Sequence, residues 1–110
     1  MAQLSYRLEG PEFLDPIQGI RGQFLAGPGP RLELVCQVEK GGILQPWLDR
    51  GAKMYHLAFE VRDLGSELER LSLGGGRLGT GPVPAVAFGG RLIAFVMLPN
   101  LMLVELIQGD

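Results

Sequence analysis

The sequence predicts an α+β fold assembled from two unequal parts. Glycine (17 residues) and proline (8 residues) divide the 110-residue chain into short segments. Most segments are apolar and of strand length, whereas residues 63–73 carry Leu64, Leu68 and Leu71 at helical spacing. We therefore expect a first part of three strands and a short helix, and a second part in the order β-α-β-β-β.

The first part is expected to contain strands at 3–9, 18–26 and 31–38. The GPGP run at 27–30 indicates a hairpin between the last two. A short helix is expected at 43–50, provided that Pro46 lies in its first turn. Cys36, the single cysteine, is expected to be a small core residue.

The second part begins with MYHLAFEV at 54–61, which has the apolar content of a buried strand. Asp63 or Ser66 can cap the following helix, and Gly74–Gly76 ends it. Three further strands are expected at 77–80, 91–98 and 101–108, with a proline-containing loop at 80–90 and a turn at Pro99-Asn100.

Composition excludes several classes of function. A hydrophobic content of 46% and a charged content of 20% indicate a globular chain. The net charge of −2, without a basic block, argues against nucleic acid as the main partner. We expect no membrane partner, because no apolar run is long enough to cross a bilayer and the N-terminus does not resemble a signal peptide. A single cysteine fits a reducing, cytoplasmic setting.

Three titratable residues interrupt apolar strands: Glu33 in RLELV, His56 in MYHLAF and Glu105 in LMLVELI. Both faces of the last strand are otherwise apolar, so the Glu105 carboxylate is expected to point into a covered space. A charge buried alone costs several kcal/mol and needs a partner. Convergence of the three residues on a divalent cation would meet that need, because imidazole and carboxylate are common ligands of zinc and manganese.

A simpler interpretation of the same residues stays open. A single strand histidine is often a hydrogen-bonded core residue, and a strand glutamate often pairs with an arginine, for which Arg31, Arg62 and Arg91 are candidates.

MYHLAFEVRDLGSELERL, followed by GRLIAFVMLPNLMLVELIQ, resembles the vicinal oxygen chelate superfamily, which includes glyoxalase I, bleomycin-resistance proteins, extradiol dioxygenases and methylmalonyl-CoA epimerase. The epimerase-like branch is the most similar, through DPIQGIRGQFL, RLELV, HLAFEV and LVELIQ. The resemblance implies one glyoxalase-like domain over 1–110, in which βαβββ modules form a curved mixed sheet. Residues 1–40 correspond to a first module without its opening strand and helix, and 54–110 to a complete second module.

The resemblance also implies site residues. Glu33, His56 and Glu105 match metal-ligand positions, and Glu105 matches a carboxylate that in some members also moves protons. The sequence departs from the family at two points. The strand that carries the family's first histidine ligand is absent, and Ile17 stands where epimerase relatives have a proton-shuttling glutamate, with Asp15 two residues away.

The predicted function is that of a metal-dependent isomerase, epimerase or lyase. Its substrate would be a small carbonyl or acyl-thioester compound that reacts through an enolate, with Glu105 as the base and zinc, cobalt, manganese, nickel or magnesium as the ion. A non-catalytic small-molecule binder like the resistance proteins is the alternative, and a scaffold without ligand or metal is a third. Because a module without its first strand leaves sheet edges unpaired, a homodimer with shared or swapped sheet elements is expected.

Overall fold

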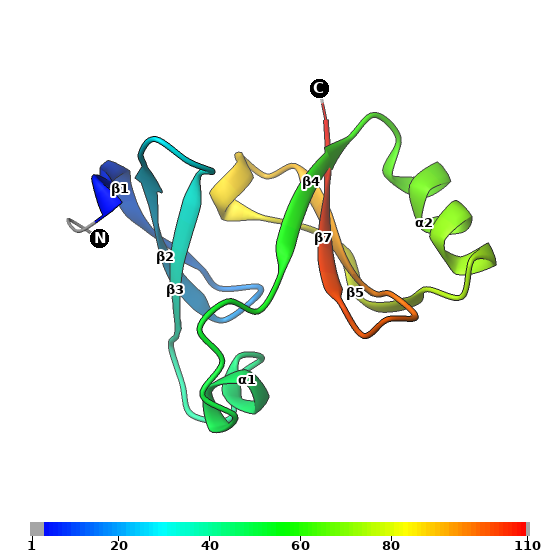
Figure 1. The fold of residues 1–110 in the computed structure, drawn as a ribbon, viewed down its shortest axis with the longest axis horizontal. Coiled ribbons are helices and arrows are strands. Elements are labelled where there is room, and N and C mark those ends of the chain that lie inside the picture. The colour runs from blue at the N-terminus through cyan, green and yellow to red at the C-terminus, as the bar shows by residue number, and fades with distance from the viewer. Residues whose placement is uncertain (1–3, 110) are drawn as a thin grey trace. The chain divides into compact units, whose positions relative to one another are not determined.

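The computed structural model describes residues 4–109 and confirms the α+β class. Its strands form two separate sheets, one of three strands and one of four (Figure 1). The chain divides into two compact units, Met1–Gly51 and Ala52–Asp110, and each sheet belongs to one of them. The expectation that both units belong to a single glyoxalase-like domain, with modules at 1–40 and 54–110, stays a prediction.

The first unit holds an antiparallel meander in the order β1-β2-β3 and one short helix. Its elements are β1 (Arg7–Asp15), β2 (Ile20–Ala26), β3 (Leu32–Gln37) and α1 (Gln45–Asp49). The hairpin around GPGP and the helix with proline in its first turn follow the sequence prediction. Cys36 is exposed on β3, so the prediction that it is a core residue was wrong.

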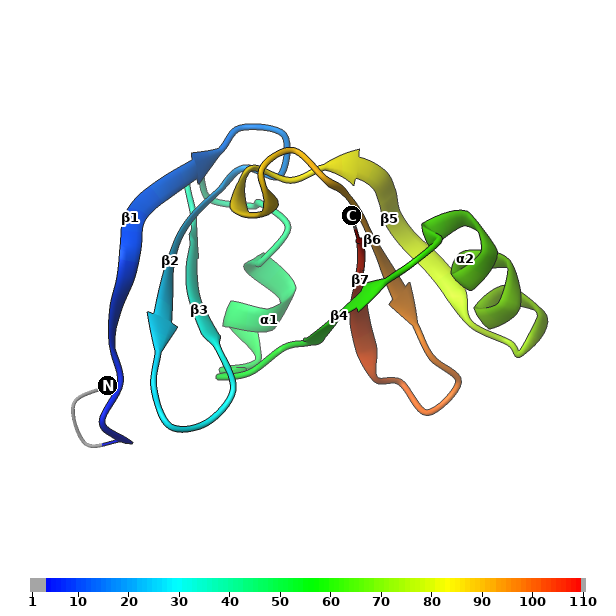
Figure 2. The same ribbon diagram turned by 90° about the horizontal axis from the view of Figure 1, so that it is seen from above.

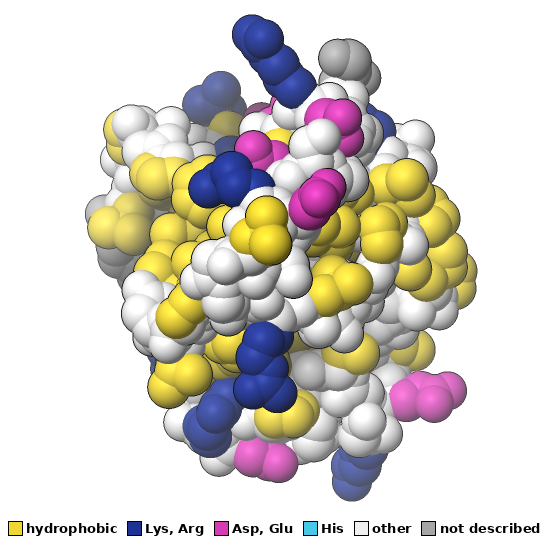
Figure 3. Space-filling model, turned by 90° about the vertical axis from the view of Figure 1, so that its right-hand side faces the viewer, with side chains coloured by type: hydrophobic (Ala, Val, Ile, Leu, Met, Phe, Trp, Pro, Cys, Tyr) yellow, Lys and Arg dark blue, Asp and Glu magenta, His cyan; other side chains and the backbone are white. Residues whose placement is uncertain are grey.

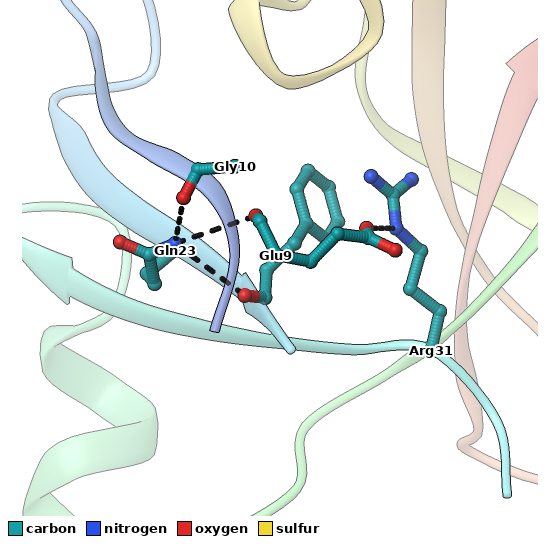
Figure 4. A network of polar contacts seen from close by, with 5 residues as sticks. Glu9, Gly10, Gln23 and Arg31 are labelled. Carbon is teal, nitrogen blue, oxygen red and sulfur yellow. Dashed lines mark hydrogen bonds and ion pairs between the residues drawn. The ribbon is translucent and has the colours of Figure 1, made fainter. Parts of the chain in front are cut away.

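The first strand lies further along the chain than the predicted segment 3–9, because Gly10 and Pro11 do not end it. The register of β1 against β2 shifts between Glu9 and Phe13, which marks a bulge, and Gly10 has a φ of 69°. Figure 4 shows how Gln23 supports this bulge: its Nε2 donates to the carbonyl of Gly10 at 2.7 Å and to that of Glu9 at 3.4 Å. The side-chain amide thus takes the place of ladder hydrogen bonds that the bulge interrupts.

The second unit has the predicted order β-α-β-β-β. Its elements are β4 (Leu57–Val61), α2 (Leu64–Leu73), β5 (Arg77–Pro84), the 3-10 turn η2 (Val86–Phe88), β6 (Leu92–Met97) and β7 (Leu103–Gln108). The strand order is β4-β7-β6-β5, with β4 parallel to β7 and the other neighbours antiparallel. Asp63 caps α2 by accepting a hydrogen bond from the Ser66 backbone N–H at 3.1 Å, as predicted.

The prediction of a loop at 80–90 was wrong for its first half, which belongs to β5. Proline cannot donate to a neighbouring strand and is therefore tolerated mainly at sheet edges. β5 is the last strand of the order β4-β7-β6-β5, so Pro82 and Pro84 are accommodated there.

The four-stranded sheet has an apolar cluster on each face. Helix α2 packs on one face (Figure 2), where Leu64 joins a buried cluster formed by Ala94, Val96, Val104 and Leu106. The alternate residues of β6 and β7 face the other way, and Ile93, Phe95 and Ile107 form a second cluster with Ala85, which lies between β5 and η2. Full burial of each large apolar side chain stabilises the fold by about 1.5–3 kcal/mol. The second face is the one that carries Glu105.

No helix within residues 4–109 is long and apolar enough to cross a membrane.

Candidate functional site

His56 lies directly before β4, and its position along the chain places it on the face that carries Glu105. Side chains alternate between faces, so His56, Ala58 and Glu60 share one side of the sheet. In the parallel pairing of β4 with β7, Ala58 is the register partner of Glu105. The imidazole therefore reaches the carboxylate from the end of the neighbouring strand.

The two side chains form a buried pair. His56 Nε2 lies 2.8 Å from Glu105 Oε1, and the side chains are 14% and 7% exposed, respectively. At this depth a carboxylate needs a partner that replaces its lost hydration, and the imidazole provides one. The prediction that Glu105 points into a covered space is thereby confirmed.

Two aromatic rings surround the imidazole. The ring centroid of Tyr55 lies 4.3 Å from that of His56, and the centroid of Phe95 lies 4.9 Å away, both at nearly perpendicular inclinations. Phe95 is the register partner of Glu105 on β6, so it belongs to the same face. Nδ1 of His56 is buried and has no hydrogen-bond partner within residues 4–109. The pair therefore lies in apolar surroundings, where its hydrogen bond is stronger than it would be in water.

His56 and Glu105 carry two donor types that zinc binds, imidazole nitrogen and carboxylate oxygen, which lie about 3.4 Å apart on a tetrahedral ion. Nε2 and Oε1 are at hydrogen-bond distance, 2.8 Å, and would have to move apart to share an ion. Among residues 4–109 no three His, Cys, Asp or Glu side chains form a group that could hold a metal ion. The structure thus brings together two of the three predicted ligands.

Glu33, the third predicted ligand, lies on β3 of the first unit and is half-buried. Its register partner on β2 is the buried residue Phe24, so both side chains share the more covered face of that sheet. Convergence of Glu33 with the His56–Glu105 pair stays a prediction.

Asp15, two residues before Ile17, has a structural role. It is fully buried at the end of β1. Its Oδ1 accepts from the backbone N–H groups of Ile17 at 3.0 Å and Gln18 at 3.1 Å, and its Oδ2 accepts from Gln18 Nε2 at 2.9 Å. The carboxylate thus holds the turn between β1 and β2.

Two of the three arginines that were candidate partners for a strand glutamate pair with other carboxylates. Arg31 Nε pairs with Glu9, and Arg91 Nη1 lies 3.4 Å from Glu60. Sequence reasoning had not assigned Tyr55 or Phe95 to the site. The predicted turn at 99–100 would have paired Phe95 with Val104, whereas the observed turn includes Leu101 and pairs Phe95 with Glu105.

Comparison with known proteins identifies a similar fold. The chain is similar to hypothetical protein BH1468 from Bacillus halodurans C-125, with a TM-score of 0.79 and 22% identity, over 96% of this chain and 77% of that one. A second structure, SMU.1112c, has a TM-score of 0.45 and 22% identity, over 97% of this chain and 83% of that one. No protein-family model and no curated protein matches the sequence.

Proposed function

We propose that this chain is a metal-dependent isomerase, epimerase or lyase of the vicinal oxygen chelate superfamily, acting in the cytoplasm on a small carbonyl or acyl-thioester compound. The observation that carries the proposal is the buried pair of His56 Nε2 and Glu105 Oε1, 2.8 Å apart. It lies on a sheet whose strands and helix follow the order β-α-β-β-β. Imidazole nitrogen and carboxylate oxygen are common ligands of divalent zinc and manganese.

In this proposal each residue has a defined role. His56 and Glu105 would hold the ion, with Glu33 as the third protein ligand. A bound divalent ion supplies Lewis-acid polarisation of a substrate carbonyl, which favours loss of the proton on the adjacent carbon. The Glu105 carboxylate accepts that proton, and the apolar neighbours Phe95 and Tyr55 keep water away from the pair.

Metal titration of the purified protein tests the ligand set. Zinc, cobalt or manganese should bind at about one equivalent per chain, and Glu105→Gln and His56→Gln should each abolish binding. Glu60→Gln is the matched control, because Glu60 lies on the same face but is exposed, so it should bind metal like the wild type. Glu33→Gln tests the third ligand by the same measurement. Binding that survives both Glu105→Gln and His56→Gln would refute the proposed site.

Solvent exchange tests the chemistry. The metal-loaded protein should exchange the hydrogen adjacent to the carbonyl for deuterium in at least one member of a panel of small carbonyl and acyl-thioester compounds, as followed by proton NMR. Glu105→Gln should stop this exchange. No exchange across the panel in protein with full metal occupancy would contradict the enzymatic proposal.

A non-catalytic small-molecule binder is the second candidate. It is favoured by the role of Asp15, whose carboxylate is held by the backbone N–H groups of Ile17 and Gln18 and by the Gln18 side chain. Ligand affinity that a chelator leaves unchanged would favour this candidate over the metal-dependent enzyme.

We also propose that the protein is a homodimer with shared or swapped sheet elements. β4 stands at one end of its sheet's strand order, and its apolar side chains Leu57 and Phe59 are 45% and 50% exposed. Apolar side chains are also spread in patches over the side that carries α2 (Figure 3). Burial of such an edge against another chain would pair its backbone groups. Sedimentation should give a dimer at micromolar concentration, and a stable monomer would contradict it.

A further inference from the structure

Among the described contacts of the His56 imidazole, one is polar and two are with aromatic rings. Nε2 lies 2.8 Å from Glu105 Oε1. The rings of Tyr55 and Phe95 meet the imidazole at inclinations of 81° and 87°, with centroids 4.3 Å and 4.9 Å away. The orientation of the ring therefore depends on one hydrogen bond and two aromatic neighbours.

The hydrogen bond determines which nitrogen carries the proton. A carboxylate only accepts hydrogen bonds, so Nε2 donates to Glu105, and in the neutral imidazole Nδ1 then keeps its lone pair. Nδ1 is buried without a partner within residues 4–109. Nothing described at Nδ1 therefore opposes rotation of the ring about the bond that joins it to the Cβ atom. Such a rotation would turn a ring carbon towards Glu105, and this torsion is intrinsically broad in histidine.

The aromatic neighbours restrict that rotation. Perpendicular edge-to-face contacts between rings are favourable and depend on the orientation of both rings. Phe95 is itself fixed, because it is buried on β6 in one cluster with Ile93 and Ile107 and lies opposite Glu105 in register. Its ring is thus held in a constant position relative to the carboxylate.

We propose that Phe95 and Tyr55 are positioning residues that hold His56 in one orientation and keep it in a single tautomer. The proton stays on Nε2, directed to Glu105, and the lone pair stays on Nδ1. The pair thereby holds its shared proton at a defined atom before any ligand arrives. This property belongs to the metal-free protein, so it does not rest on the proposed enzymatic function.

Nitrogen-15 NMR of the imidazole tests the proposal directly. His56 is the single histidine of the chain, so its two ring nitrogens give the only imidazole signals. In chelator-treated wild-type protein at alkaline pH, where imidazole is neutral, the two shifts should be far apart, as for one protonated and one unprotonated nitrogen. Phe95→Leu should move the two shifts towards each other, because both orientations and both tautomers become populated.

Two control variants separate positioning from general loosening of the fold. Phe59→Leu removes an aromatic ring from β4 on the opposite face, and Ile93→Val loosens the cluster that contains Phe95 without removing a ring. Both should keep the wild-type shifts. Convergence of the shifts in either control would overturn the proposal, since loss of packing alone would then explain the effect.

Tyr55 provides a second test, which remains informative if Phe95→Leu does not fold. Tyr55 is half-buried and precedes β4, so its replacement disturbs the sheet less. Tyr55→Leu should bring the nitrogen shifts together, whereas Tyr55→Phe keeps the ring and should restore the wild-type shifts. Wild-type shifts in folded Phe95→Leu or in Tyr55→Leu would overturn the proposal, because Glu105 alone would then orient the imidazole.

Discussion

Replacement of His56 by alanine tests how strongly the buried pair stabilises the second unit. The change removes the hydrogen-bond partner of Glu105, whose side chain is only 7% exposed. Loss of one member of a buried ionisable pair costs about 3–5 kcal/mol, since it leaves the other member without compensation. The imidazole itself is 14% exposed, so its removal admits some water, and we expect a loss near the lower end, about 3 kcal/mol.

A loss of this size is large for a chain of 110 residues. Domains of this length have a free energy of unfolding of about 5–15 kcal/mol. With a urea slope of about 1–3 kcal/mol per molar, the midpoint of unfolding should fall by about 1–3 M, which far-ultraviolet circular dichroism can follow. The metal-free protein is the sample for this measurement.

Two further variants decide whether the unpaired Glu105 carboxylate causes the loss of stability in His56→Ala. Glu60→Gln disrupts the pair with Arg91, in which the Glu60 side chain is 62% exposed, and should change stability by about 1 kcal/mol or less. The combined change of His56 and Glu105 to leucine removes both polar groups and should cost less than His56→Ala alone. If His56→Ala proved as mild as Glu60→Gln, the imidazole would not be compensating a buried charge, and the reasoning would be wrong.

Three other predictions concern the ion, the helix cap and a glycine. Zinc bound at Nε2 leaves the neutral imidazole with its proton on Nδ1 in place of Nε2, so calorimetry in buffers of different ionisation enthalpy should show little net release of protons. Hydrogen bonds from Ser66 lower the pKa of Asp63 below its usual value of 3.8. The capping contribution is therefore complete above pH 3.8 and is lost as pH falls through the lower folded value, so the stability difference between wild type and Asp63→Ala should shrink on acidification. A Cβ at Gly81, where φ is 93°, would collide with a backbone oxygen of β6, so Gly81→Ala should cost at least about 2 kcal/mol in urea unfolding, against about 1 kcal/mol for Gly89→Ala in open space.

Local rules were sufficient for helix α2 because its sequence signals agree with one another. Asp63 at the start of the helix, leucines at helical spacing and glycine at its end all indicate the same element. The last hairpin turns through residues 99–101 and pairs Phe95 with Glu105, whereas a turn of residues 99 and 100 alone would have paired Phe95 with Val104. Agreement between signals of different kinds is what makes an element predictable from sequence.

The first strand shows where the same rules fail. Gly10 and Pro11 are breakers in most settings, so they suggested that a strand ends near Glu9. In the structure a bulge accommodates both residues, and the side-chain amide of Gln23, on the neighbouring strand, donates hydrogen bonds to the carbonyl groups of Glu9 and Gly10. The compensating residue is distant in sequence, so no local pattern could reveal it. Pro82 and Pro84 are a second example, because their tolerance depends on the edge position of β5.

The candidate site also has a part that is predictable from sequence and a part that is not. Alternation along a strand fixes the face on which a side chain lies, and the parallel pairing of β4 with β7 brings His56 to Glu105 within one sheet. Glu33 belongs to a different sheet, and alternation does not determine which face of one sheet meets which face of another. A ligand set within one sheet is therefore predictable from strand order and register, whereas a set that spans two sheets depends on how the sheets pack. Metal titration of Glu33→Gln tests whether Glu33 joins the ligand set, and it does so without altering the His56–Glu105 pair.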